Sequence, residues 1–457
     1  MWNDVCAKVF KECVEEFKNS NIRYFVLRNY QKLPAENIGK DVDIIVEPKK
    51  LKNAKKILKS VYAKNNLKYY DEAIFDKLHC MHGMGVENNT GIHIDLIGGY
   101  LVRGYEIYTF DELYSHTKWY NDFCVLDEFF EGIMLLIYKQ FGYQKPKLKQ
   151  AYRDDIYETY ANYTEEFQQE LIRVTSKKLA GEIINDIKKK DFDNMLKKSG
   201  ELTKALKKYV NKKRFFKTRF RKIRFLWQRA DRIIFRYRKY TRAFAVLAPD
   251  GTGKTTFLDA LIKELNYYYV NDEKDERCHV YHFRPTILPN LGAVGEKAGI
   301  MEQDTNWTDP HRNKPANPLS SFVRIAYYTL DYILGWQKCV RRDVHYDRFT
   351  VFDRYSYDFI VDPLRTKLGL PTWVRKFFVR LTPQPKIVFV LDANPEIIYA
   401  RKQELTKEEI TRQLGVYRKL ADSHKRFRKI SAEQTPEEMA KEAVEIILNQ
   451  YTEKLEK

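Results

Sequence analysis

Apolar positions near the start of the chain follow the spacing of an amphipathic helix and then of short strands. Valine, phenylalanine and cysteine residues at 5, 9, 10, 13, 14 and 17 fall on one helical face. Three short apolar segments follow at 24–27, 41–46 and 92–97, each with the length of a strand. The pattern predicts an α/β domain over residues 1–105.

Residues 106–200 change to a helical pattern. The apolar run at 129–138 has the character of a buried helix, and a polar, helix-rich stretch comes after it. We expect this part to be a helical extension of the first domain. A basic and aromatic segment over 201–242 then separates it from the rest of the chain, and we expect a linker helix there.

From residue 243 onward, apolar strands alternate with helices. We expect strands at 243–247, 279–283, 350–352 and 386–391, and helices at 320–341, 395–401, 407–426 and 436–448. This alternation predicts a parallel sheet with its ligand at the carboxyl ends of the strands. The expected fold class is therefore α/β, with a parallel-sheet domain at 243–457. A proline-rich loop at 309–318 is either a lid or acceptor-binding element or a plain surface loop.

The segment after the strand at 243–247 has the composition of a phosphate-binding loop. It comprises Ala248, Pro249, Asp250, Gly251, Thr252, Gly253, Lys254, Thr255 and Thr256. Glycines let backbone N–H groups surround phosphate oxygens, the lysine reaches the β and γ phosphates, and the Thr255 hydroxyl can hold Mg²⁺. Ala248 replaces the usual first glycine, so the turn must accept a methyl group there. The loop predicts a nucleotide enzyme.

Later strand ends carry further candidate residues. Asp353 can reach Mg²⁺ or an acceptor hydroxyl and Arg354 can clamp a phosphate, although a structural ion pair is the alternative. Asp392 is either a metal ligand or a helix N-cap. Arg401 and Arg412 lie on a basic helical segment that can fold over a triphosphate, or they form solvated helix faces. His282 and His311 are expected to be ordinary polar residues.

The phosphate loop, the triplet Asp353-Arg354-Tyr355 and the turn from Leu391 to Glu396 together resemble thymidylate kinase and its nucleoside-monophosphate kinase relatives. The resemblance covers residues 243–450. It implies a P-loop kinase core, ATP and Mg²⁺ as the donor, Asp250 facing the acceptor, Arg354 near the phosphates, and a lid around Arg401 and Arg412. Thymidylate kinases carry an Arg-Glu-Pro-Gly type of segment after the second strand, where this chain has residues 282–285 in the order His-Phe-Arg-Pro. The reaction type therefore carries over better than the acceptor.

Three aspartates form a candidate metal site in the first domain. Asp41 and Asp43 alternate along one expected strand and share a face, while Asp95 lies on a later strand. Clustered carboxylates can hold the metal ions of phosphoryl or nucleotidyl transfer. Over residues 20–100 this layout resembles the nucleotidyltransferase superfamily.

The first domain departs from that superfamily just before its aspartates. The superfamily normally carries Gly-Ser on the preceding strand, where this chain has 27–30 in the order Leu-Arg-Asn-Tyr. Either Arg28 or Lys40 replaces the missing contacts, or the domain binds a nucleotide or sugar phosphate without catalysis. An aspartate-rich strand end in an unrelated α/β domain is the remaining alternative.

The net charge of the whole chain is +19, and most of this positive charge lies in one segment. Residues 201–240 hold 16 Lys or Arg against two acidic residues, and bulky apolar side chains interleave with the cations. Such a helix suits an anionic membrane face, a nucleic acid, or a position between two domains with its cations in water. The six cysteines form no C-x-x-C pair, and no segment has the length and apolarity of a signal or transmembrane segment. We expect a cytoplasmic protein, peripheral at the inner membrane face.

These features together predict an ATP- and Mg²⁺-dependent phosphotransferase. The expected acceptor is a sugar or glycan intermediate of surface polysaccharide synthesis, or a nucleoside monophosphate. The expected partners are the nucleotide, this acceptor, a membrane surface at residues 201–240 and a second copy of the chain. One rival hypothesis is a nucleotidyltransferase that uses Asp41, Asp43 and Asp95, with a regulatory P-loop domain. Another is a nucleotide-gated scaffold that binds membrane or nucleic acid.

Overall fold

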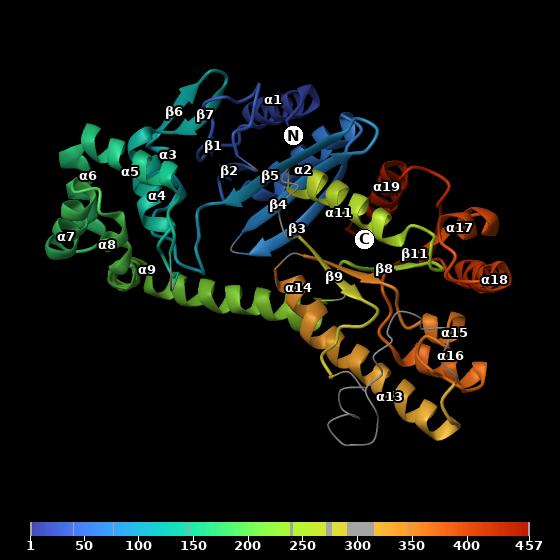
Figure 1. Ribbon diagram of the computed structural model, residues 1–457. Coiled ribbons are helices and arrows are strands. Elements are labelled where there is room, and N and C mark those ends of the chain that lie inside the picture. Colours follow the sequence, from blue (N-terminus) through green and yellow to red (C-terminus); the bar gives the residue numbers. More distant parts are fainter. Residues whose placement is uncertain are drawn as a thin grey trace. The chain divides into compact units, whose positions relative to one another are not determined.

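The chain folds into two compact units, which are described separately. The computed structural model describes residues 2–39, 41–75, 77–143, 146–237, 241–270, 277–289, 315–346 and 348–455. The units are Met1–Ala230 and Asp231–Lys457 (Figure 1). Lys40, His311 and most of the proline-rich loop 309–318 lie outside the described residues, so the expectations for them stay predictions.

The first unit is built on a mixed sheet. Its strands are β1(Tyr24–Val26), β2(Val42–Val46), β3(Lys68–Phe75), β4(Leu78–Gly85), β5(Thr90–Gly98), β6(Thr117–Tyr120) and β7(Phe123–Leu126). Their order is β3-β4-β5-β2-β1-β7-β6. The pairs β2–β5 and β1–β7 are parallel, and the other neighbours are antiparallel. Because β6 and β7 belong to this sheet, it continues past the boundary expected at residue 105.

Helices cover the sheet and extend the first unit. They are α1(Asp4–Asn19), α2(Leu51–Lys64), α3(Phe110–Tyr114), α4(Glu128–Tyr138), α5(Gln150–Asn162), α6(Thr164–Val174), α7(Lys177–Lys188), α8(Phe192–Lys197) and α9(Ser199–Ala230). The apolar face expected for the first helix is buried on α1, where Phe10 and Phe17 are fully covered. The apolar run at 129–138 forms the buried part of α4, as expected.

A break in the backbone divides α9 into two helices. Arg214 has the non-helical angles φ −140° and ψ 39°. Its guanidinium donates to the carbonyl oxygens of Glu106 and Ile107 and to a carboxylate oxygen of Glu112. Before the break, apolar side chains such as Leu206 are buried in the first unit.

The second unit contains a five-stranded sheet in which every pair is parallel. Its strands are β8(Ala243–Leu247), β9(Cys278–His282), β10(Phe349–Asp353), β11(Ile387–Asp392) and β12(Phe427–Ser431), in the order β12-β11-β8-β10-β9. The expected α/β class is therefore confirmed, with one mixed sheet and one parallel sheet. β12 was not expected from the sequence.

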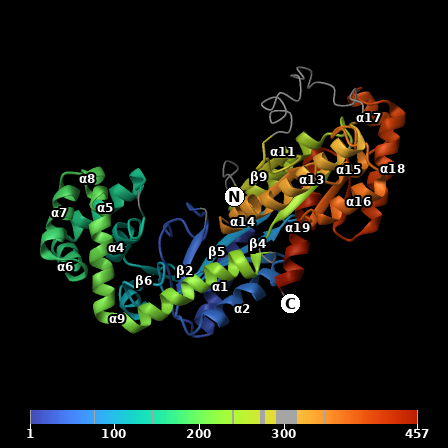
Figure 2. The same cartoon turned by 90° about the horizontal axis from the view of Figure 1, so that it is seen from below.

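Helices lie on both faces of the parallel sheet. They are η1(Asp231–Phe235), which is a π-helical turn, α11(Lys254–Val270), α13(Pro318–Gly335), the π-helical turn η3(Trp336–Val340), α14(Arg341–His345), α15(Asp358–Val361), α16(Thr372–Leu381), α17(Pro395–Arg401), α18(Lys407–Ser423) and α19(Pro436–Leu455). α11 and α19 pack together on one face, and α13, α15 and α16 lie on the other (Figures 1 and 2). The single helix expected at 320–341 is wrong in detail, because η3 interrupts it and α14 continues to His345.

Alternate residues of β8 reach the two cores on either side of the parallel sheet. Leu247 belongs to the core that contains Tyr332 and Trp336 from the α13 side. Phe244 packs edge-on against Phe389 of β11, which in turn contacts Phe257 of α11. β8 is therefore covered on both faces, which is why it reads as an unbroken apolar run. Among the described residues, no helix has both the length and the apolarity needed to cross a membrane.

Candidate functional site

The predicted phosphate-binding loop lies at the point where the parallel sheet changes direction. β8 is central, and the chain first adds β9 and β10 on one side of it and then β11 and β12 on the other. The connection after β8 leads to β9 on one side, and the connection after the neighbouring β10 leads to β11 on the other, and ligands of open α/β sheets bind at such points. Asp353, at the end of β10, is paired in register with Val246 of β8, so both strand ends meet there.

The loop conformation depends on two glycines. Gly251 and Gly253 have φ angles of +84° and +96°, which side chains with a Cβ rarely adopt. A Cβ at Gly251 would also lie 3.0 Å from Cβ of Lys402. α11 begins directly at Lys254, so the first N–H groups of the helix face the loop. Ala248 is fully buried at the end of β8, so its methyl group is accommodated inside the unit.

Lys254 is folded into the loop that it is expected to serve. Its Nζ donates to the carbonyl oxygens of Ala248, at 3.1 Å, and of Pro249, at 3.0 Å. Burial and the neighbouring Arg354 lower the pKa of Lys254 to about 8. Thr255 and Thr256, which follow on the first turn of α11, are exposed. The ammonium group is therefore close to the loop, and the threonine hydroxyls can be reached from solvent.

Asp250 is held by several cations and does not stand free toward an acceptor. Arg354 and Arg365 each donate to one of its carboxylate oxygens, and Lys254 Nζ lies 3.5 Å away. Burial would raise the pKa of Asp250, but Arg354, Lys254 and Arg365 hold it far below its usual range. These contacts place Asp250 as a brace of the loop, whereas the expected role of facing the acceptor stays a prediction.

Arg354 connects this brace to the core of the second unit. It is only 2% exposed and has a φ of +74°. Its second arm donates to Asp358, at 3.0 Å, and the other oxygen of Asp358 accepts from Tyr417 of α18, at 2.8 Å. Arg365, Asp358 and Tyr417 were not singled out from the sequence. They lie far from the loop along the chain, and no local motif marks them.

Asp353 has a carboxylate oxygen suited to a further ligand. Its Oδ2 is 2.9 Å from Nδ1 of His282 on β9, a pair that the sequence did not indicate. Among the described residues, its buried Oδ1 has no hydrogen-bond partner. Burial would raise the pKa of Asp353, but His282 and Lys254 hold it below its ordinary value, so the group is an anion. An anionic oxygen beside a phosphate loop and the Thr255 hydroxyl is the kind of donor set that Mg²⁺ takes.

Arg401 and Arg412, which were both expected in a lid over the triphosphate, make different contacts. Arg401 donates to the carbonyl oxygen of Ala432 at 3.0 Å and reaches that of Thr252 at 3.5 Å, which brings it to the phosphate loop. Arg412 instead pairs with Glu409 and donates to the carbonyl oxygen of Val361. Its expected contact with phosphates is not supported by these interactions and stays a prediction.

Asp392 binds a neighbouring cation. Its carboxylate accepts two bonds from Nε and one from Nη2 of Arg418, at 2.7 to 3.0 Å. The N-cap of α17 is Asn394, whose side chain accepts from the N–H of Glu396. The helix-cap alternative for Asp392 is therefore wrong, because Asn394 takes that position. Its metal alternative stays a prediction.

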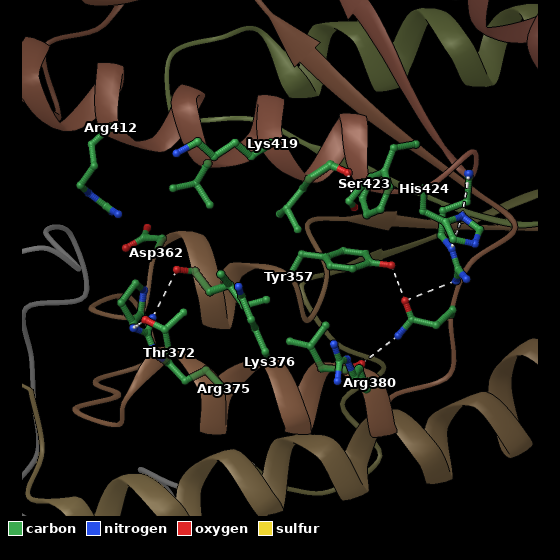
Figure 3. A pocket seen from close by; sticks show the side chains of 18 of the residues that line it. Tyr357, Asp362, Thr372, Arg375, Lys376, Arg380, Arg412, Lys419, Ser423 and His424 are labelled. Carbon is green, nitrogen blue, oxygen red and sulfur yellow. Dashed lines mark hydrogen bonds between the residues drawn. The ribbon is translucent and has the colours of Figure 1, made fainter.

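A large, open cavity lies between α15, α16 and α18. Its volume is about 1030 Å³, and basic side chains such as Arg375, Lys376 and Lys419 line it together with apolar ones (Figure 3). Asp362 lines the same cavity and accepts a bond from Arg365, the residue that donates to Asp250. The wall of the cavity is thus linked to the phosphate loop by two ion pairs.

The structure brings the three aspartates of the first unit together. Ligand oxygens of Asp41, Asp43 and Asp95 lie within 4.8 Å of one another, and Asp43 pairs in register with Asp95 across parallel strands. Asp41 precedes β2 and is not part of it. The expected clustering is confirmed, and the metal itself stays a prediction.

A cation contacts this cluster. Nε and Nη2 of Arg28 lie 2.9 and 2.8 Å from the same oxygen of Asp43. Burial raises the pKa of Asp43 to about 6, although Arg28 acts against this rise. For Asp95, burial would raise the pKa, but His93 and Cys80 hold it below its ordinary value. The guanidinium of Arg28 therefore neutralises part of the negative charge that would be needed to bind two divalent metal ions.

Comparison with known proteins gives a structural likeness but no family. No family model matches the chain, and no curated protein matches it. Among solved structures, thymidylate kinase from Ehrlichia chaffeensis aligns with 45% of this chain and 98% of its own, at 13% sequence identity and a TM-score of 0.30.

Proposed function

We propose that the second unit transfers the γ-phosphoryl group of ATP to an acceptor in the presence of Mg²⁺. The observation that supports this most is the phosphate loop at the switch point of the sheet, with Lys254 inside it and the unpartnered Asp353 Oδ1 at the adjacent strand end. Backbone N–H groups from Gly251 to Thr255 and the Lys254 ammonium would bind the phosphates. Arg401 lies beside these N–H groups, because its guanidinium reaches the carbonyl oxygen of Thr252. Thr255 and Asp353 would hold Mg²⁺, which supplies neutralisation of phosphate charge.

Phosphoryl transfer of this kind depends mainly on positioning and charge neutralisation. Asp250, braced by Arg354 and Arg365, would keep the loop in place for this positioning. The basic cavity linked to the loop favours an anionic acceptor. We propose as the acceptor an anionic sugar or glycan intermediate of surface polysaccharide synthesis, or a nucleoside monophosphate, since both carry negative charge.

The rival nucleotidyltransferase hypothesis has less support. Its three carboxylates are gathered, but Arg28 binds Asp43 where positive metal charge would be needed. The direct test is acceptor-dependent release of ADP from ATP by the full chain, with nucleoside monophosphates, free sugars and glycan extracts as acceptors. ADP that appears only with an acceptor supports the proposal. Release of pyrophosphate in place of ADP would support the rival.

The pKa of Lys254 predicts a pH dependence of nucleotide binding. Its ordinary value is 10.5 and burial lowers it to about 8, so the side chain is charged below that pH and neutral above it. Because only the ammonium form attracts phosphate, we expect the Kd for ATP to be constant from pH 6.5 to 7.5. It should then rise about tenfold per unit at pH values well above the pKa.

Fluorescence titration with a labelled ATP analogue checks this dependence. The Lys254→Met chain serves as the control, and its weaker binding should not change over the same pH range. A wild-type Kd that stays flat to pH 9.5 would contradict the role given to the ammonium group. The same shift affects stability with the opposite sign, because the unfolded chain keeps this proton between about pH 8 and 10.5, so folding gains stability as the pH rises across that window.

A further inference from the structure

Several metal-binding side chains share one face of the mixed sheet in the first unit. The strand register pairs Cys80 with Asp95 and His82 with His93 across β4 and β5, and Asp43 with Asp95 across β2 and β5. Paired residues of neighbouring strands point to the same side of a sheet. A thiol, two imidazoles and two carboxylates therefore lie on one face.

Three of these side chains are close enough to bind a single ion. The ligand atoms of Cys80, His93 and Asp95 all lie within 4.8 Å of one another. Tetrahedral zinc, with bonds of about 2.0–2.3 Å, places its ligands about 3.3–3.8 Å apart, so small side-chain rotations are sufficient. The His82 ring lies against the His93 ring at a tilt of 32°, with centroids 3.9 Å apart, and offers a further imidazole on the same face.

The chemistry of these donors selects a class of metal. Thiolate and imidazole prefer zinc and similar first-row transition ions, whereas Mg²⁺ prefers oxygen ligands alone. The all-oxygen alternative at Asp41, Asp43 and Asp95 shares Asp95, but Arg28 contacts Asp43 there. We propose that Cys80, His93 and Asp95 bind a zinc-type transition metal ion, a site that is independent of the kinase activity proposed for the second unit.

Cobalt(II) titration of the full chain tests this site without any activity assay. A thiolate ligand to Co²⁺ gives a charge-transfer band in the near ultraviolet, which carboxylate ligands do not give. We expect this band to saturate at one ion per chain and to disappear when Zn²⁺ is added. Cys80→Ser should abolish it, and His93→Gln should weaken the affinity for Co²⁺ by roughly 10–100-fold.

A matched control is Cys278→Ser, because Cys278 is a partly exposed cysteine of the second unit. Its titration should equal that of the wild type. The proposal is overturned if no thiolate band forms, if the band survives Cys80→Ser, or if Co²⁺ binds with a carboxylate-type spectrum alone. Far-ultraviolet circular dichroism shows that each variant is folded.

A second observation concerns the exposed half of α9. Phe216, Phe220, Ile223 and Trp227 are 85%, 70%, 67% and 62% exposed. Their spacing of four, three and four residues places them along one helical face, which we call the α9 stripe. Large apolar side chains in a continuous row on a surface mark an interaction site.

The other side of this helix is attached to the first unit. Arg221 pairs with Glu106 at 2.7 Å, Lys222 donates to the Tyr105 hydroxyl at 3.1 Å, and Thr218 is buried. These residues lie opposite the α9 stripe on the helix, so the stripe faces away from the unit that holds it.

Cations border the stripe. Lys217 and Arg219 are exposed beside it, within a segment where basic residues far outnumber acidic ones. An apolar face bordered by Lys and Arg complements both the acyl boundary and the head groups of an anionic lipid surface. We infer that the α9 stripe docks on such a surface. Nucleic acid is less favoured because the aliphatic Ile223 forms part of the row.

Vesicle sedimentation tests this docking. We expect the full chain to bind vesicles of phosphatidylcholine with phosphatidylglycerol but not pure phosphatidylcholine, and to dissociate at high salt. The double variant Phe216→Ser/Phe220→Ser should lower the partition coefficient roughly tenfold or more. Trp119→Ser, at a 60% exposed aromatic of β6, is the control and should bind like the wild type.

Three results would overturn the inference. The first is equal vesicle binding by the double variant and the wild type. The second is binding of single-stranded nucleic acid with no vesicle binding. The third is a wild-type dimer that is lost in the double variant, while neither protein binds vesicles.

Discussion

Replacing Lys254 with alanine is expected to lower kcat/KM for phosphoryl transfer by at least about 100-fold. The loss of one preorganised charge that stabilises the transition state typically costs this much or more. Lys254 is the ammonium group enclosed by the phosphate loop, where it contacts the carbonyl oxygens of Ala248 and Pro249. Steady-state kinetics with the identified acceptor measures the effect.

Two further variants make this result specific. Lys254→Met keeps the buried aliphatic stem and should lose as much activity as Lys254→Ala, which separates the charge from the packing. Lys263→Ala removes an exposed lysine of the same helix α11, and its activity should stay within roughly twofold of the wild type. If Lys254→Met retained most of the transfer rate, the phosphate loop would not be the catalytic site.

Replacing Arg354 with alanine is expected to destabilise the second unit by about 3–5 kcal/mol. The guanidinium bridges Asp250 of the loop and the fully buried Asp358, and its removal leaves an uncompensated charge in the interior. The loop brace is lost at the same time, so activity should fall even at temperatures where the variant is folded. Urea denaturation, followed separately for the two units, measures the change in the free energy of unfolding.

A double variant distinguishes the buried charge from a general packing defect. Arg354→Met with Asp358→Asn removes both charges, keeps similar volume, and leaves an amide oxygen to accept from Tyr417. We expect it to recover more than half of the stability lost in Arg354→Ala. If the free energy of unfolding of Arg354→Ala were within about 1 kcal/mol of the wild-type value, the ion-pair network around Arg354 would contribute little to the stability of the fold.

The parts of the fold that were predictable are those where burial dictates sequence. β8 is covered on both faces and is an unbroken apolar run, β10 and β11 are mostly apolar, and the glycines that follow β8 predicted a phosphate-binding loop. α17 has the expected bounds because Pro395 lies at its first turn. β12 was missed because Arg428 and Lys429 lie within this edge strand, whose exposed side needs no apolar residues.

The sheet of the first unit was harder to read. β4 carries two histidines, one cysteine and two glycines, which is unusual for a strand, and its Cys80 belongs to the mixed donor set with His93 and Asp95. β6 and β7 are only four residues long. Small or polar residues and short strands therefore obscured the strand pattern in this region.

The residue types of the candidate sites were predictable from the sequence, but the ion pairs and hydrogen bonds that connect these residues were not. The period-two spacing of Asp41 and Asp43 indicated that their carboxylates gather with Asp95. The pairing of Asp250 with Arg365, which is 115 positions away, depends on the packing of the whole unit. The same holds for His282 and Asp353, whose contact follows from the adjacency of β9 and β10.

The most direct test of the central claim is the fate of the γ-phosphate. ATP labelled with ¹⁸O in that group is incubated with the full chain and the acceptor panel, and products are identified by mass spectrometry. We predict ADP and an acceptor that carries the labelled phosphoryl group, formed by the wild type and by Asp41→Asn/Asp43→Asn but not by Lys254→Ala. Labelled pyrophosphate, formed by Lys254→Ala and lost in the double aspartate variant, would contradict the account.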